Sequence, residues 1–163
     1  GISAAQWARL LGASHVTVIG RHEDKRPLVE GCGVNYATAV DRSYDFVLEA
    51  VGSSTAINEA IKAVNPGGSL VLMGNPAGDI QLAQDVYWRI LRKQLTIKCT
   101  WNSSYVGPNA SDWTEAADAI SKGKVLVENL ISHTFPQEEL RRGLDLMAEH
   151  RQPYCKVMTV WNQ

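Results

Sequence analysis

Two basic side chains follow a short β-branched run near the start of the chain, where they could bind a phosphate group. Residues 15–19 (HVTVI) have the composition of a strand, and Gly20, Arg21 and Lys25 come soon after them. A guanidinium holds phosphate oxygens with its planar fork of N–H donors, and a nearby ammonium adds positive charge. The alternative is that Arg21 is a solvated side chain of an ordinary loop.

Small residues follow two further apolar runs. Residues 44–51 (YDFVLEAV) lead to Gly52, and residues 69–73 (SLVLM) lead to Gly74. Because ligands of open α/β sheets collect at the carboxyl ends of the strands, both ends are candidate binding positions. The candidates are Ala50, Val51 and Gly52 after the first run and Met73, Gly74 and Asn75 after the second. Both glycines could equally be simple turn glycines.

The cysteines and histidines do not form a pattern typical of a metal site. Cys32, Cys99 and Cys155 are far apart and outside any CxxC spacing. This argues against a zinc knuckle or a disulfide framework and favours a reduced, intracellular protein. Three histidines lack Cys or carboxylate partners at ligand spacing and are predicted to be surface or structural residues: His15, His22 and His150. We therefore predict no metal ligand in this chain and no catalytic role for His133.

The composition excludes some classes of partner. The chain has 163 residues, of which 45% are hydrophobic, and 16 basic against 17 acidic residues give a formal net charge of −1. Such a balance creates no large field that would attract nucleic acid or an anionic membrane. No stretch of the sequence approaches the apolar length of a membrane span. We expect one globular chain with a small-molecule partner.

These candidate residues need an alternating series of strands and helices to position them. Apolar spacing and breaker residues predict helices at 1–11, 23–30, 55–64, 85–92, 112–122 and 137–149, and strands at 15–19, 35–38, 44–51, 69–73, 95–100 and 156–161. Gly12 is placed to cap the first helix, and residues 102–109 are predicted as a loop. The apolar strand runs indicate a parallel sheet with helices on both faces, so the fold class is α/β.

Several segments, taken in order, resemble medium-chain NAD(P)-dependent dehydrogenases of the zinc-type alcohol/polyol kind. GISAAQWARLLGASHVTVI is similar to the first helix and second strand of their dinucleotide-binding domain, and Gly1 matches the third glycine of GxGxxG. The other matching segments are DFVLEAVG, NPGGSLVLMG, ILRKQLTIKCTW and LISHTFPQEEL. Within the family, residues 91–105 and 112–125 are most similar to polyol and polyol-phosphate dehydrogenases of the galactitol-1-phosphate and sorbitol dehydrogenase type.

The resemblance implies a doubly wound (Rossmann) parallel sheet that lacks its first strand. Residues 1–101 would form the dinucleotide-binding domain, and residues 102–163 would return to the GroES-like catalytic domain. In the doubly wound order the first strand is central, so its absence would leave two strand edges without their neighbour. We therefore expect this chain to be a fragment of a longer protein, and inactive by itself.

The resemblance also assigns roles to the candidates. Gly1 would place the first helix N-terminus at the cofactor pyrophosphate, which the basic Lys156 would also reach. Gly20 stands where NAD-dependent relatives have an acid, so Arg21 favours NADP over NAD, and Lys25 adds positive charge that suits either cofactor. Residues 50–52 would lie near the adenosine and residues 73–75 near the nicotinamide carboxamide. Trp101 and Asn102 would flank the nicotinamide and the substrate, although Trp101 could instead be an interface or core aromatic.

The expected function is hydride transfer between a secondary alcohol, a polyol or polyol phosphate, and NAD(P). The resemblance implies a cytoplasmic homodimer or homotetramer, with zinc held by ligands outside this chain. Two alternatives remain open on the sequence. The first is a zinc-free quinone or enoyl reductase of the same superfamily, and the second is a nucleotide-binding module without chemistry.

Overall fold

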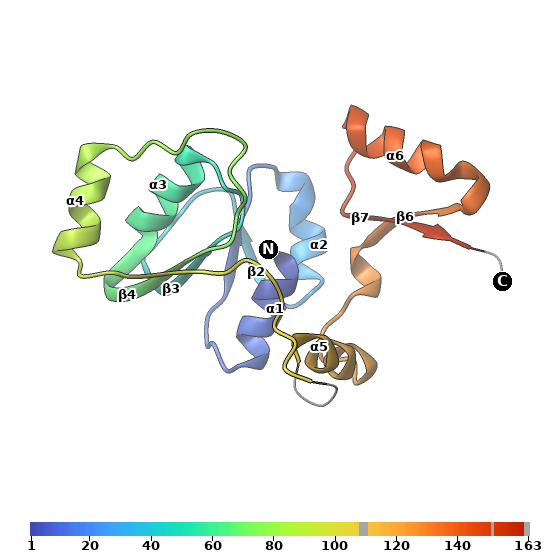
Figure 1. Ribbon diagram of the computed structural model, residues 1–163, viewed down its shortest axis with the longest axis horizontal. Helices are drawn as coiled ribbons and strands as arrows, with labels where there is room; N and C mark the ends of the chain where they lie inside the picture. The colour runs from blue at the N-terminus through green and yellow to red at the C-terminus, as the bar shows by residue number, and fades with distance from the viewer. Residues whose placement is uncertain (108–110, 151, 162–163) are drawn as a thin grey trace. The chain divides into compact units, whose positions relative to one another are not determined.

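The structure, a computed structural model, describes residues 1–107, 111–150 and 152–161. The chain forms two compact units, one made of Gly1–Thr38 with Gly107–Gln163 and the other of Ala39–Val106 (Figure 1). Part of the loop predicted at residues 102–109 lies outside the described residues. No helix in the described part is long and apolar enough to cross a lipid bilayer.

The first unit begins with a helix and a pair of parallel strands. Its elements are α1 (Ile2–Leu10), β1 (Thr17–Ile19), the 3-10 turn η1 (Glu23–Lys25), α2 (Arg26–Glu30) and β2 (Asn35–Ala37). β1 pairs with β2 in parallel, with Val18 opposite Tyr36. After α1, Gly12 has a φ of +98°, which confirms its predicted role at the end of that helix. The core of this part contains Ala5, Val29, Cys32, Val34, Tyr36 and Leu130.

The same unit closes with a second parallel strand pair. Its elements are α5 (Asp112–Ser121), η2 (Glu128–Leu130), β6 (Ile131–Pro136), η3 (Gln137–Glu139), α6 (Leu140–Glu149) and β7 (Lys156–Val160). β6 pairs with β7 in parallel. Sequence reasoning did not predict β6, whose alternating polar and apolar residues are a weak signal at this length. The Gln6 amide joins the two ends of the unit: its Nε2 donates to the Leu126 carbonyl at 3.0 Å and its Oε1 accepts from the Leu126 amide at 2.7 Å.

The second unit is a three-stranded parallel sheet with helices between its strands. It contains β3 (Tyr44–Glu49), α3 (Ser54–Ala63), β4 (Val64–Leu72), α4 (Gln84–Arg92) and β5 (Thr96–Cys99), in the strand order β3-β4-β5. Helices α3 and α4 lie beside the sheet (Figure 1). They share one core with it, in which Ile61, Leu70 and Val86 are almost completely buried. Ser53 caps α3 by accepting a hydrogen bond from the Ala56 amide at 3.2 Å.

The start of β4 differs from the prediction. The sequence predicted a turn at residues 65–68 and a strand from residue 69, whereas β4 begins at Val64 and contains an irregularity opposite Tyr44–Phe46. Helix α3 ends at Ala63, and the Gly67 amide donates to the Lys93 carbonyl at 2.7 Å, which keeps the segment against the sheet. A Cβ on Gly68 would lie 2.8 Å from the Asp45 carbonyl oxygen, so only glycine fits here.

The strand pairing agrees with the doubly wound order. All the pairs are parallel, which confirms the predicted class. Among the described residues β1 pairs only with β2, and β3 only with β4. Each of these two strands therefore has a single described neighbour in its own unit.

Candidate functional site

The turns after β3 and β4 lie against each other in the second unit. Gly52 has a φ of +80°, a conformation that side chains rarely adopt, and a Cβ on it would lie 2.5 Å from the Asn75 carbonyl carbon. A Cβ on Gly74 would lie 2.6 Å from the Val51 amide nitrogen. A side chain at either position would overlap the main chain of the other turn, so both positions need glycine. An ordinary turn glycine is not restricted in this way.

Exposed side chains follow each of the three strands of this unit. Val51 is 64% exposed after β3, and Met73 is 39% exposed after β4. Trp101, which follows β5, is 77% exposed, so it is not a core aromatic within its unit. Asn102 is also exposed. Val51, Met73 and Trp101 are thus exposed apolar side chains that follow β3, β4 and β5.

Glu49 organises both turns, and sequence reasoning missed it. Its Oε1 accepts hydrogen bonds from the Val51 amide at 2.7 Å and the Gly52 amide at 2.9 Å. Its main-chain carbonyl accepts from the Met73 amide at 2.9 Å and the Gly74 amide at 3.1 Å. A carboxylate at the end of an otherwise apolar strand run was the available sequence signal.

The turn after β1 is built around Tyr36 in the first unit. The Tyr36 hydroxyl donates to the His22 carbonyl at 2.6 Å, and its ring carbons would lie 2.8 and 2.9 Å from a Cβ on Gly20. Arg26 fixes the ring from the other side, because its Nη1 donates to the Tyr36 carbonyl at 2.8 Å and its guanidinium lies 5.2 Å from the ring centroid. Glycine at position 20 therefore makes room for Tyr36.

The two cations near this turn have different surroundings. Arg21 is exposed and, within the residues that the structure describes, makes no hydrogen bond or ion pair. Lys25 is partly buried, and its Nζ donates to the Tyr154 carbonyl at 2.8 Å. Lys25 thus links η1 to the segment that leads into β7, and Arg21 is the cation left available to a ligand.

The N-terminus of α1 lies within electrostatic reach of Lys156. Although Gly1 is exposed by surface area, atoms packed around its amino group lower the pKa of that amine, and the charge of Lys156 lowers it further. Lys156 begins β7, so the first helix and the last strand of the chain bring two predicted pyrophosphate contacts together. A helix N-terminus next to an ammonium is a favourable place for an anion.

Metal-ligating side chains do not gather in the described part of the chain. No group of three or more His, Cys, Asp or Glu residues there could hold a metal ion. All three cysteines are free thiols. Cys32 is buried, and this burial, followed by the proximity of Cys155, raises the pKa of its thiol.

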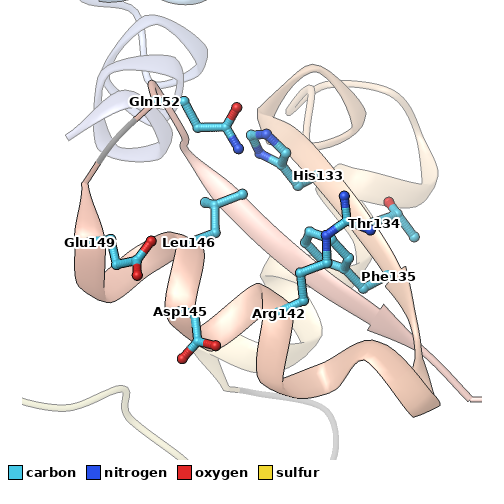
Figure 2. Close-up of a pocket in the computed structure, with 8 residues that line it drawn as sticks. All are labelled: His133, Thr134, Phe135, Arg142, Asp145, Leu146, Glu149 and Gln152. Carbon is cyan, nitrogen blue, oxygen red and sulfur yellow. The ribbon is translucent and has the colours of Figure 1, made fainter.

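His133 lies in a cavity between β6 and α6 that the sequence did not predict. The cavity has a volume of about 480 Å³, and Figure 2 shows His133 and Phe135 from the strand facing Arg142 and Glu149 from the helix. The imidazole and the Phe135 ring are stacked with their centroids 6.4 Å apart. Arg142 pairs with Glu139 at 2.8 Å. The mixed charge of this lining does not define a ligand, and we assign it none.

Known proteins share both the sequence pattern and the fold. A statistical description of the family "Zinc-binding dehydrogenase" matches residues 1–122. L-threonine 3-dehydrogenase of Vibrio vulnificus is 27% identical over 161 residues, which cover 90% of this chain and 45% of that protein. Galactitol 1-phosphate 5-dehydrogenase of Escherichia coli is 27% identical over 168 residues, or 94% of this chain and 48% of that protein.

A solved structure of one of these relatives matches the fold of this chain. The crystal structure of galactitol-1-phosphate dehydrogenase from Escherichia coli matches with a TM-score of 0.81 at 25% identity, covering 96% of this chain and 49% of that one. The chain thus spans about half the length of the relatives it matches. Because the family pattern covers residues 1–122 of 163, the chain belongs to the zinc-binding dehydrogenase family.

Proposed function

We propose that this chain is the cofactor-binding part of an oxidoreductase that transfers hydride between a polyol or polyol phosphate and NAD(P). The observation that carries the proposal is the glycine-only contact between the turns after β3 and β4, with Val51 and Met73 exposed beside it. Main chain without side chains at a strand end is what a dinucleotide needs for close approach.

Each unit, taken by itself, contains residues that suit a part of a nicotinamide dinucleotide. The α1 N-terminus with Lys156 suits the pyrophosphate, and the exposed guanidinium of Arg21 suits a charged group at the ribose. The proposed contacts are Gly1, Gly20, Arg21, Lys25, Ala50, Val51, Gly52, Met73, Gly74, Asn75, Trp101, Asn102 and Lys156. Of these, Lys25 has the weakest support, because Tyr154 already accepts its hydrogen bond.

The described part of this chain does not offer a zinc site, because no three of its His, Cys, Asp or Glu side chains lie close enough together to hold a metal ion. When bound, the nicotinamide supplies the hydride donor or acceptor. The residues of this chain bind the anionic and aromatic parts of the cofactor, and the contact between Gly52 and Gly74–Asn75 fixes the backbone surface that receives it.

The cofactor preference that we propose is NADP(H). Gly20 leaves the end of β1 without a carboxylate that would repel a 2′-phosphate, and Arg21 is available to bind one. We further propose that residues 1–101 form the dinucleotide-binding domain and residues 102–163 return to the catalytic domain. We propose a homodimer or homotetramer in the cytoplasm; the free thiols support a reducing compartment.

The test uses the complete gene product. Calorimetric titration with NADP⁺ and NAD⁺ measures binding, and the absorbance of the reduced nicotinamide measures turnover across polyols, polyol phosphates and L-threonine. Binding with turnover of a polyol or polyol phosphate supports the proposal. Binding without turnover of any alcohol favours a nucleotide-binding module, turnover of quinones or enones favours a reductase, and no binding of either nucleotide overturns the proposal.

A further inference from the structure

The end of β3 contains a buried carboxylate that packing alone does not explain. Glu49 is 4% exposed, and its Oε2 has no hydrogen-bond partner among the residues that the structure describes. A buried polar atom without a partner costs free energy, and an apolar side chain would fill the same space without that cost. The carboxylate must therefore be favoured for what its other atoms do.

The other carboxylate oxygen holds the turn after β3, and it does so beside the turn after β4, which the main-chain carbonyl of the same residue holds. Oε1 accepts from the amides of Val51 and Gly52, at 2.7 and 2.9 Å, which folds the turn after β3 back onto the strand end. The carbonyl of the same residue accepts from Met73 and Gly74, at 2.9 and 3.1 Å, which draws in the turn after β4. One residue thus anchors both turns.

The main chains of the two turns are closely packed against each other. A Cβ on Gly52 would lie 2.5 Å from the Asn75 carbonyl carbon, and a Cβ on Gly74 would lie 2.6 Å from the Val51 carbonyl carbon. Main-chain segments packed this closely cannot move independently. If the turn after β3 lost its anchor, the surface formed by both turns would change.

We propose that Glu49 is a positioning residue of the nucleotide site, which holds the two turns in contact and so sets the surface on which the cofactor lies. The inference rests on the proposed function and adds to it the residue that shapes its binding surface. Glu49 does not touch the cofactor; it acts through Val51, Gly52 and Gly74.

The test compares two substitutions of Glu49 with a matched control in the complete gene product. Glu49→Leu keeps the bulk of the side chain and removes the acceptor, whereas Glu49→Gln keeps one carbonyl oxygen. Glu59→Gln changes an exposed glutamate on α3 and serves as the control. We expect Glu49→Leu to raise the Kd for the nicotinamide dinucleotide about tenfold, as the loss of a charge-assisted acceptor predicts.

The other readouts separate positioning from stability. Glu49→Gln should restore most of the affinity, and Glu59→Gln should bind as the wild type does. The Kd for the dinucleotide should change more than the KM for the alcohol measured at saturating cofactor, because the anchor acts on the dinucleotide surface. A merely structural role would lower the Tm of Glu49→Leu and leave its Kd unchanged at temperatures where the variant is fully folded.

Hydrogen exchange of the wild type keeps the proposal testable if Glu49→Leu does not fold. Peptides that contain residues 49–52 and 73–75 should gain protection together when the dinucleotide binds. Protection of neither segment overturns the inference, as does unchanged affinity in folded Glu49→Leu. A wild type that binds no nicotinamide dinucleotide overturns the proposed function as well, so the two failures are distinguishable.

Discussion

The aromatic ring of Tyr36 occupies the space that a side chain at position 20 would need. A Cβ on Gly20 would lie 2.8 Å from Tyr36 Cε2, and the ring cannot swing away because it is 6% exposed and its hydroxyl is bonded to the His22 carbonyl. In dinucleotide-binding folds an acid near the end of this strand binds the ribose. Here the packing of β2 against β1 excludes that acid.

Gly20→Ala should therefore destabilise the protein. Overpacking of a buried contact costs about 1–3 kcal/mol, and we expect a loss of this size in urea unfolding. Gly78→Ala is the control, because a Cβ there would meet nothing within 4 Å. By the same argument Gly20→Asp should not produce a simple NAD-specific protein. Equal stability of Gly20→Ala and Gly78→Ala would contradict the Tyr36 contact.

Arg21→Ala should lower the preference for NADP⁺ over NAD⁺ on the order of tenfold in kcat/KM. The guanidinium is exposed, which reduces its charge-assisted contact from the full value of about 1.5–3 kcal/mol toward the lower figure. Lys25→Met is the comparison, because its ammonium is bonded to Tyr154 and its loss should leave the preference unchanged. If the wild type favours NAD⁺, or if Arg21→Ala has the same ratio of kcat/KM for NADP⁺ and NAD⁺ as the wild type, Arg21 is a solvated loop residue.

Lys156→Gln should weaken both cofactors by the same factor, several-fold at low salt. The pyrophosphate is common to NAD⁺ and NADP⁺, so the loss of an ammonium beside the α1 N-terminus cannot change their ratio. Added salt should reduce the difference between wild type and variant, because exposed charges are screened. Titration calorimetry of both nucleotides measures this, with the exposed Lys124→Gln as control. A change in the ratio of the NADP⁺ and NAD⁺ affinities would show that Lys156 does not act at the pyrophosphate.

Cys32 should react with iodoacetamide more slowly than Cys99 in the folded protein. The thiolate is the reactive form, and burial raises the pKa of the Cys32 thiol, whereas Cys99 is exposed. Mass spectrometry of timed samples gives both rates. Modification of Cys32 at the rate of Cys99 would show that its site opens readily.

The raised pKa of Cys32 also gives a pH dependence of stability. Above the unfolded thiol pKa the folded state keeps a proton that the unfolded state has lost. Stability therefore falls as the pH rises from the unfolded pKa through the raised folded one. Cys32→Ala should have a flatter profile of Tm against pH over this alkaline range. An identical slope in both proteins would contradict the assignment.

The sequence predicted most elements but not all of their ends. Residues 1–11 and 44–51 became α1 and β3 because helical spacing and an apolar run are local signals. The start of β4 was predicted five residues late, since the turn composition of residues 65–68 carries no information about its bonds to Lys93. β6 was missed because its pairing with β7 is a contact between distant segments.

The sequence by itself determined the series of strands and helices, the parallel class and the glycines at the strand ends, because spacing and turn chemistry act over a few residues. Only the tertiary structure decided that Tyr36 requires Gly20, that Tyr154 holds Lys25 and leaves Arg21 available, and that Glu49 anchors two turns. Each of these depends on hydrogen bonds and overlaps between segments that chain folding brings together, and no local pattern encodes such distances.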